Sequence, residues 1–358
     1  MLFLLYLFAV WLLITWAVAR FVLSGSDHSQ FDSDLNKNYI QVFSDDPEDK
    51  VANGEFMQTI SNARVKARAT RSVPKAFAMV RDFADNLSND IDSDCDFTSV
   101  EFEGVKAEWA VAPGADTNRR VLFHHGGAFL LGSPKGHRWF AHQLSHIANA
   151  AVLSVDYRML PRHSRGQGIK DAQAGYRHIL ENSPTDQSPA SFLLLAGDSA
   201  GGNLTMMLSS WSAEESLRRP EGVIGFSPSL DMTGQSPTLK SNLKTDPILG
   251  EGLGLLASVP YMFTAWLQLF VLRMNPADRS ASPLFYELKD LPKTLIHASS
   301  TEMLLGESVR YTNKAQANGS DVSLQVWENQ LHDWHLFNRT RGSAGAAWQE
   351  IEKFVKSL

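Results

Sequence analysis

The stretch "FLLLAGDSAGGNL", which runs from Phe192 to Leu204, decides how the rest of the chain is interpreted. Five apolar residues, typical of a buried strand, lead directly into Gly-Asp-Ser-Ala-Gly-Gly. The segment Gly197–Gly201 matches G-x-S-x-G, a pattern that places a nucleophilic serine on a sharp turn between a strand and a helix. Glycines are needed there because larger neighbours would clash with the strained serine backbone. The alternative is a tight turn that needs small residues only, so other parts of the chain have to decide the role of Ser199.

A second glycine motif, "HGGAF" (His125–Phe129), comes directly after a short apolar strand. Backbone N–H groups in such a loop can stabilise the oxyanion that forms when a serine attacks a carbonyl group. We expect Gly126 and Gly127 to supply two of these donors, and Ala200, the residue after the serine, to supply a third. The alternative is a glycine turn that only packing requires. We interpret His125 as structural rather than as a base, because it ends the strand before the loop.

Apolar strand-like segments alternate with helix-like segments through most of the chain. Strands that alternate with helices imply an α/β fold with a mostly parallel central sheet flanked by helices on both faces. Before these strands and helices, apolar and polar residues alternate at 98–113, which predicts a hairpin with Gly104 near its turn. The expected strands lie at 120–125, 151–157, 191–197, 222–228, 294–299 and 322–327, and the expected helices at 139–149, 169–181 and 202–211.

The N-terminus carries eighteen uncharged, mostly apolar residues at Leu2–Ala19, about the length of a membrane-spanning helix. We expect residues 1–23 to form a hydrophobic helix that serves as an uncleaved membrane anchor. A signal segment is the alternative, because "AVA" at the end of the run resembles a cleavage site; its cleavage would give a secreted or periplasmic protein. Arg20 and Lys37 follow the run and no basic residue precedes it, which favours a cytoplasmic catalytic domain.

Residues 24–95 are interpreted as a tether followed by part of a helical cap. The segment 24–47 is polar and rich in Asp, Ser and Asn, as expected of a tether. Apolar residues then recur at helical spacing between 49 and 87, and Pro74 separates two expected helices.

Residues 96–358 are interpreted as the catalytic domain. Its alternating order is interrupted at about 246–275 by a long apolar stretch that contains Pro260. We interpret this stretch as a second helical cap element over a pocket, because Pro260 and Glu251 argue against a second membrane span.

Composition limits the classes of partner and cofactor. The net charge of −6 argues against a nucleic-acid partner, which usually leaves a basic patch. Cys95 is the one cysteine, so no intrachain disulfide can form. His142 and His146 have the i, i+4 spacing of one helix face, but no carboxylate accompanies them in the sequence, and a catalytic zinc site needs a third ligand. We therefore expect no metal and no organic cofactor.

The glycine motifs together resemble those of serine esterases of the α/β-hydrolase fold, specifically the hormone-sensitive-lipase-like group. The resemblance rests on "HGGAFLLGS" (His125–Ser133), "DYRMLP" (Asp156–Pro161) and "GDSAGG" (Gly197–Gly202), and it covers about residues 98–358. Two departures are visible. Ala128 replaces the third glycine of the first motif, and Arg162 stands where the group usually has a glutamate.

The resemblance also implies an acid after a late strand, since the triad order in this fold is serine, acid, histidine. Glu302 begins "EML", which matches the glutamate version of the group's pattern, and it is the expected acid. Glu307 is the rival, although it lies further along and inside the expected helix. An exposed helix-capping acid is the structural alternative.

The base should follow the last strand. His332 comes five residues after the expected end of that strand at Trp327, and an aromatic residue follows it as in the group's motif. His332 is the expected base and His335 the rival. The adjacent Asp333 is interpreted as incidental.

These observations predict a membrane-tethered carboxylic ester hydrolase that works through an acyl-enzyme. Ser199 attacks the ester, His332 moves the proton and Glu302 orients His332. The apolar character of the expected cap suggests a hydrophobic ester or lactone as substrate. The alternatives are an amidase or other serine acyl hydrolase, and a non-catalytic relative of the same fold that binds a small ligand or a partner.

Overall fold

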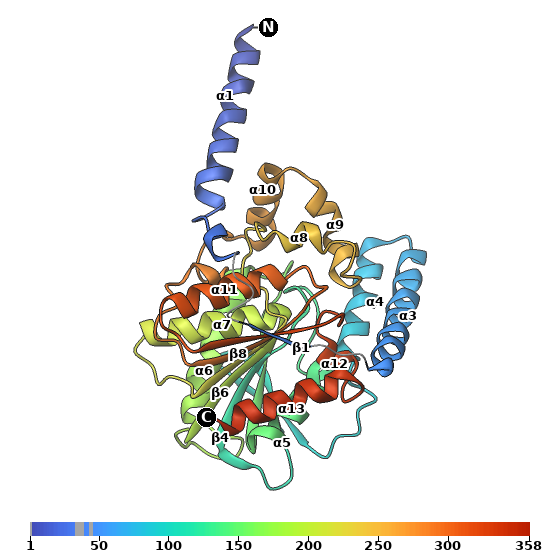
Figure 1. Ribbon diagram of the computed structural model, residues 1–358, viewed down its shortest axis with the longest axis vertical. Coiled ribbons are helices and arrows are strands. Elements are labelled where there is room, and N and C mark those ends of the chain that lie inside the picture. Colours follow the sequence, from blue (N-terminus) through green and yellow to red (C-terminus); the bar gives the residue numbers. More distant parts are fainter. Residues whose placement is uncertain (1, 33–38, 43–45) are drawn as a thin grey trace.

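The computed structural model describes residues 2–32, 39–42 and 46–358 (Figure 1). The strands are β1 (Tyr39–Val42), β2 (Asp96–Phe102), β3 (Val105–Val111), β4 (Asp116–His124), β5 (Ala150–Asp156), β6 (Phe192–Asp198), β7 (Gly222–Phe226), β8 (Lys293–Ser299) and β9 (Val322–Trp327). In this part of the chain they form one nine-stranded sheet in the order β1-β9-β8-β7-β6-β4-β5-β3-β2. Neighbouring strands run parallel, except that β3 pairs antiparallel with β2 and β5. The predicted mostly parallel sheet is confirmed, including the hairpin of β2 and β3.

Helices cover both faces of the sheet, because successive side chains of its strands point to opposite sides. In β4, Leu122 belongs to one large apolar cluster, whereas Val121 and Phe123 belong to another. Both clusters are buried, which explains why the central strands are apolar throughout. The first cluster includes residues of α6 (Arg165–Glu181), α7 (Ser199–Glu214) and α11 (Leu305–Ala317), and the second includes residues of α5 (Arg138–Ala148) and α13 (Ser343–Lys356).

The segment predicted as a tether contains structure that the sequence analysis missed. Strand β1 pairs in parallel with β9 at the sheet edge. Upstream of it, Asp32 forms a two-point ion pair with Arg310 of α11, with nitrogen-to-oxygen distances of 2.5 and 2.8 Å. The prediction of a tether did not anticipate these contacts. An open sheet edge offers unpaired backbone groups, which an extended segment such as β1 can satisfy. The remaining tether positions, 33–38 and 43–45, lie outside the described residues.

The apolar N-terminal segment is helical. Helix α1 (Leu2–Val18) continues into a π-helical turn at Ala19–Leu23, and it extends away from the rest of the molecule (Figure 1). Residues Phe3–Leu23 are long and apolar enough to cross a membrane, with a mean hydropathy of 1.9, although a signal sequence would have the same properties. The C-terminal end of this helix packs on α10 (Tyr261–Leu272), where Trp266 Nε1 donates a hydrogen bond to the carbonyl oxygen of Thr15.

Two further groups of helices form where the sequence predicted helical segments. Helices α3 (Pro47–Ala69) and α4 (Val73–Asp85) pack against each other, and Pro74 lies in the first turn of α4. The interruption at 246–275 forms α9 (Leu249–Ser258) and α10, with Pro260 immediately before α10. Among the described residues only the N-terminal helix is long enough to be a candidate membrane span, so a second span at 246–275 finds no support.

Candidate active site

Ser199 occupies a strained turn at the junction of β6 and α7. Its φ of +50° lies in the left-handed region, which costs a non-glycine residue free energy unless the surroundings enforce it. Glycine is required next to this turn, because a Cβ on Gly201 would overlap the carbonyl oxygen of His124 in β4. The strand, sharp turn and helix around Ser199 are therefore the structural context that a nucleophilic serine requires.

The structure brings Ser199, His332 and Glu302 together from the ends of three different strands. Ser199 Oγ lies 2.9 Å from His332 Nε2, and His332 Nδ1 lies 2.8 Å from Glu302 Oε2. The other oxygen of the glutamate accepts a hydrogen bond from the backbone N–H of Ser299, at the end of β8. All three side chains are buried, so each is fixed by its partners rather than by solvent. The arrangement can pass a proton from the serine hydroxyl to the imidazole while the carboxylate holds the ring.

The two rival residues lie in other environments. Glu307 accepts hydrogen bonds from the backbone N–H groups of Leu230 and Asp231, at 2.6 and 3.0 Å. His335 Nε2 lies 3.0 Å from His297 Nδ1, within a buried aromatic group. Neither side chain forms a hydrogen bond with Ser199, so the geometry favours Glu302 and His332 over both rivals.

The loop after β4 lies beside the serine. Gly127 has a φ of +112°, and a Cβ there would overlap the carbonyl oxygen of Leu131. Tyr157 supports this loop from the DYR motif, because its hydroxyl donates a 2.6 Å hydrogen bond to the carbonyl oxygen of His125. The His125 ring is buried and stacks on Tyr157, in agreement with its interpretation as a structural residue. Gly126 packs tightly against Asp198, which leaves no room for a side chain there.

Asp333 lies closer to the site than the sequence indicated. One of its carboxylate oxygens is 3.1 Å from His332 Nε2, the same ring nitrogen that faces Ser199. Burial alone would lower the pKa of His332, but the carboxylates of Asp333 and Glu302 outweigh it and hold this pKa well above its usual value. Burial in turn raises the pKa of the Asp333 carboxyl to about 7. The description of Asp333 as incidental is wrong, because its carboxyl lies within hydrogen-bond distance of the His332 nitrogen that faces Ser199.

A second histidine and carboxylate pair supports the turn. His137 Nε2 lies 3.4 Å from Asp198 Oδ2, and both side chains are almost fully buried. Burial lowers the pKa of His137, but the adjacent Asp198 carboxylate more than offsets this, so the pKa lies above its usual value. The sequence offered one signal for this pair, since Asp198 is the variable residue directly before the serine in G-x-S-x-G.

An apolar cavity of about 270 Å³ lies over Ser199 and His332. Glycine-loop residues Gly127 and Ala128 form part of its wall beside the serine. Most of the remaining wall comes from α3, α4 and the chain at the start of α9: Phe56, Ile60, Ala63, Arg64, Val80, Phe83, Ala84, Ile248 and Leu249. The reactive hydroxyl therefore faces a space suited to apolar groups.

Comparisons with known proteins agree with this geometry. Residues 121–336, more than half of the chain, match the sequence model of the α/β hydrolase fold family. An esterase from Acinetobacter venetianus is 32% identical over 262 residues, which are 72% of this chain and 81% of that esterase. Esterase LipU from Mycobacterium tuberculosis is 30% identical over 249 residues, which are 69% of this chain and 80% of LipU. The crystal structure of an esterase from the bacterial hormone-sensitive lipase family has a TM-score of 0.70 at 27% identity and covers 84% of this chain and 97% of its own. The chain therefore belongs to the α/β-hydrolase fold family, as a serine ester hydrolase of the hormone-sensitive-lipase-like group.

Proposed function

We propose that the protein hydrolyses carboxylic esters through an acyl-enzyme formed on Ser199. The observation that carries this proposal is the continuous hydrogen-bonded line from Ser199 through His332 to Glu302 at the wall of an apolar cavity. A serine hydroxyl is a weak nucleophile on its own, and a base within hydrogen-bond distance activates it.

The reaction follows from the positions of these groups. Ser199 Oγ attacks the ester carbonyl carbon while His332 Nε2 takes the hydroxyl proton, and Glu302 stabilises the imidazolium. The backbone N–H groups of Gly126, Gly127 and Ala200 stabilise the oxyanion. His332 then gives its proton to the leaving alcohol, and it activates a water molecule in the same way to release the acid.

The cavity favours hydrophobic esters or lactones, because its wall is mostly aliphatic and aromatic. Named relatives support ester chemistry on small and lipid-like substrates: one is a carboxylesterase/phospholipase from Mycobacterium tuberculosis at 29% identity, and another is an acetyl-hydrolase from Streptomyces hygroscopicus at 30% identity. A similar esterase crystal, with a TM-score of 0.68, was soaked with p-nitrophenyl butyrate.

The wall of the cavity supports a domain organisation in which the catalytic domain spans residues 96–358. Residues 24–95 and an insertion within that domain, at about 246–275, cover its active site. Helices α3 and α4 and the start of α9 supply most of the apolar wall over Ser199. Strand β1 is the exception within 24–95, because it extends the central sheet instead.

Residues 1–23 are proposed to anchor the protein in a membrane, with the catalytic domain in the cytoplasm. Helix α10 supports this anchor, because it packs on the base of the N-terminal helix and exposes Phe263, Leu267 and Phe270 beside it. Such an apolar face next to a membrane span is suited to the lipid interface. If the N-terminal helix is instead a signal segment, the mature protein is released into the medium or periplasm.

The proposal is tested by hydrolysis of p-nitrophenyl acetate, butyrate and laurate, with the full chain in detergent micelles. We expect turnover that falls by at least about 10⁴-fold in Ser199→Ala, since that variant removes the nucleophile. Ser210→Ala is the control, because Ser210 lies on the same helix, α7, eleven residues beyond Ser199 and outside the cavity wall, and should retain activity. Butyranilide, assayed in parallel, separates an esterase from an amidase, and undiminished turnover by Ser199→Ala would refute the proposal.

A further inference from the structure

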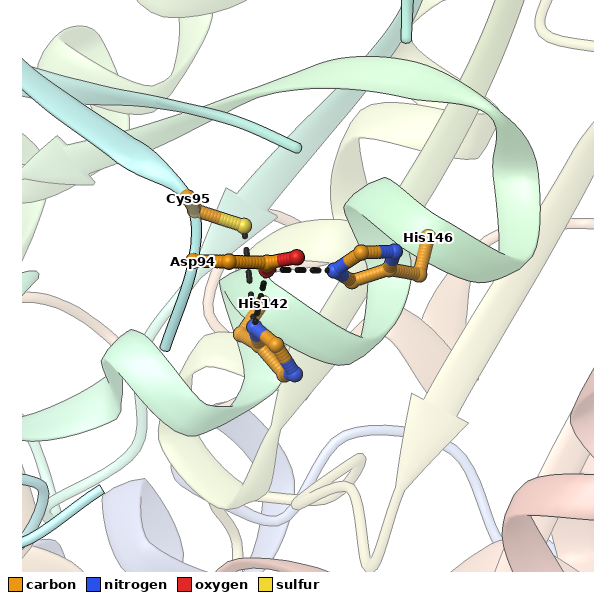
Figure 2. Close-up of side chains that lie close together, drawn as sticks. All are labelled: Asp94, Cys95, His142 and His146. Carbon is orange, nitrogen blue, oxygen red and sulfur yellow. Dashed lines mark hydrogen bonds and ion pairs between the residues drawn. The ribbon is translucent and has the colours of Figure 1, made fainter. Parts of the chain in front are cut away.

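Four potential metal ligands meet beside α5, a helix that contributes to the second apolar cluster. His142 and His146 project from one face of α5 toward Asp94 and Cys95, which lie just before β2 (Figure 2). The expectation that no carboxylate accompanies the histidine pair is wrong, because the fold brings Asp94 to it from about fifty residues upstream. The sequence hid this arrangement, since Asp94 and Cys95 belong to an irregular segment with no motif spacing.

The separations between the ligand atoms suit a single ion. Asp94 Oδ1 lies 2.8 Å from His146 Nε2 and 3.7 Å from His142 Nδ1, and Cys95 Sγ lies 3.6 Å from His142 Nδ1. All four atoms lie within 4.8 Å of one another. With bonds of about 2.0–2.3 Å, ligand atoms of a tetrahedral zinc ion lie about 3.3–3.6 Å apart, so small side-chain shifts are enough.

Charge and exposure also favour a cation at this position. Asp92 and Asp96 flank the cluster in the sequence, so three carboxylates lie in this short segment. Cys95 is 8% exposed, whereas the side chains of His146 and Asp94 are 41% and 55% exposed, which gives an ion a path from solvent.

We propose that Asp94, Cys95, His142 and His146 form a structural zinc site. Two imidazoles and a thiolate are ligands that favour zinc over magnesium or calcium. Four protein ligands close a tetrahedral site and leave no open position for substrate, as in structural zinc sites. The ion ties the segment that enters β2 to helix α5.

Binding releases one proton and replaces the contacts that the ligand atoms make without the ion, among them the 2.8 Å hydrogen bond between His146 Nε2 and Asp94 Oδ1. Zn²⁺ displaces the proton of the Cys95 thiol to solvent as the zinc–sulfur bond forms. His142 Nδ1 exchanges its 3.0 Å hydrogen bond with Ser93 Oγ for the bond to zinc.

The site connects to the catalytic loop through one side chain. The Trp139 ring stacks on His142, and its Nε1 donates a 3.0 Å hydrogen bond to the carbonyl oxygen of His335, three residues after His332. An ion on His142 would therefore restrain the helix that holds this part of the loop in place.

The proposal is tested with the full chain in detergent micelles, stripped of metal with EDTA and titrated with Zn²⁺ by calorimetry. We expect one ion per chain, and with Co²⁺ as a probe a tetrahedral absorption spectrum with a thiolate-to-cobalt charge-transfer band. Cys95→Ser should abolish that band. His146→Ala, at an exposed position where folding is safe, should weaken zinc binding by more than about 100-fold, since loss of even an outer partner costs about 10- to 100-fold.

His178→Gln is the matched control, because His178 lies on α6, outside the cluster, and its substitution should leave both measurements unchanged. The proposal is overturned if the wild-type chain takes up no ion, or if it binds one that Cys95→Ser and His146→Ala bind equally well.

Discussion

Two sites in this molecule pair a histidine with a carboxylate at the same distance of 2.8 Å, yet their surroundings differ. His332 and Glu302 are buried, and the third partner is the hydroxyl of Ser199. His146 and Asp94 are substantially exposed, and their neighbours are a second imidazole and a thiol. A buried pair beside a hydroxyl is suited to proton transfer, whereas an exposed pair beside soft ligands is suited to a cation. The chemistry is therefore set by burial and by the third group rather than by the pair itself.

The histidines give the largest expected contrast. His332→Ala should lower kcat/KM for p-nitrophenyl butyrate by at least about 10⁴-fold, because the serine loses its base. His335→Gln should keep activity within about tenfold and lower the free energy of unfolding by about 1–3 kcal/mol, because its buried hydrogen bond to His297 is disturbed. Equal losses of activity in the two variants would contradict the assignment of His332 as the base.

The two glutamates sharpen the same comparison. Glu302→Ala should lower kcat by about 10³- to 10⁴-fold, since His332 loses the carboxylate that orients it. Glu307→Gln keeps an acceptor oxygen for the N–H groups of Leu230 and Asp231, so its kcat should change by less than about tenfold. Steady-state kinetics decides, and the reverse order of effects would make Glu307 the acid.

The stability of the folded chain should depend on zinc bound at the site that contains Asp94 and His146. Zinc at about 100 times its dissociation constant should stabilise the folded chain by about 2.7 kcal/mol, and EDTA should reverse this. Thermal unfolding of wild type and His146→Ala, each with zinc and with EDTA, measures the effect. A zinc-dependent rise in Tm that persists in His146→Ala would place the ion elsewhere.

The smallest effect concerns the pH dependence of activity. Asp333 raises the pKa of His332, and the histidine must be neutral to accept the serine proton. Asp333→Asn should therefore lower the pKa of His332 and move the acidic limb of the kcat/KM profile to lower pH. A limb that stays in place, or moves to higher pH, would contradict the assigned role of this carboxylate.

The sequence predicted those parts of the fold and site that regular elements carry. The nucleophile turn and the glycine loop each follow a strongly apolar strand, and strand order together with the resemblance to the esterase group pointed to Glu302 and His332. Strand β1 was missed because it is short, lies in a polar segment and gains its structure only from pairing with β9. The contacts of Asp94 and Asp333 were missed because both residues lie in irregular segments. Side-chain contacts there depend on tertiary packing and follow no repeating sequence pattern.

The central claim is that Ser199 carries the acyl group. Mass spectrometry of the full chain, quenched with acid during turnover of p-nitrophenyl butyrate, tests it directly. We predict one butyryl group per chain on the peptide that contains Ser199, and none in Ser199→Ala. A butyryl group on another residue, or an adduct that persists in Ser199→Ala, would contradict the account.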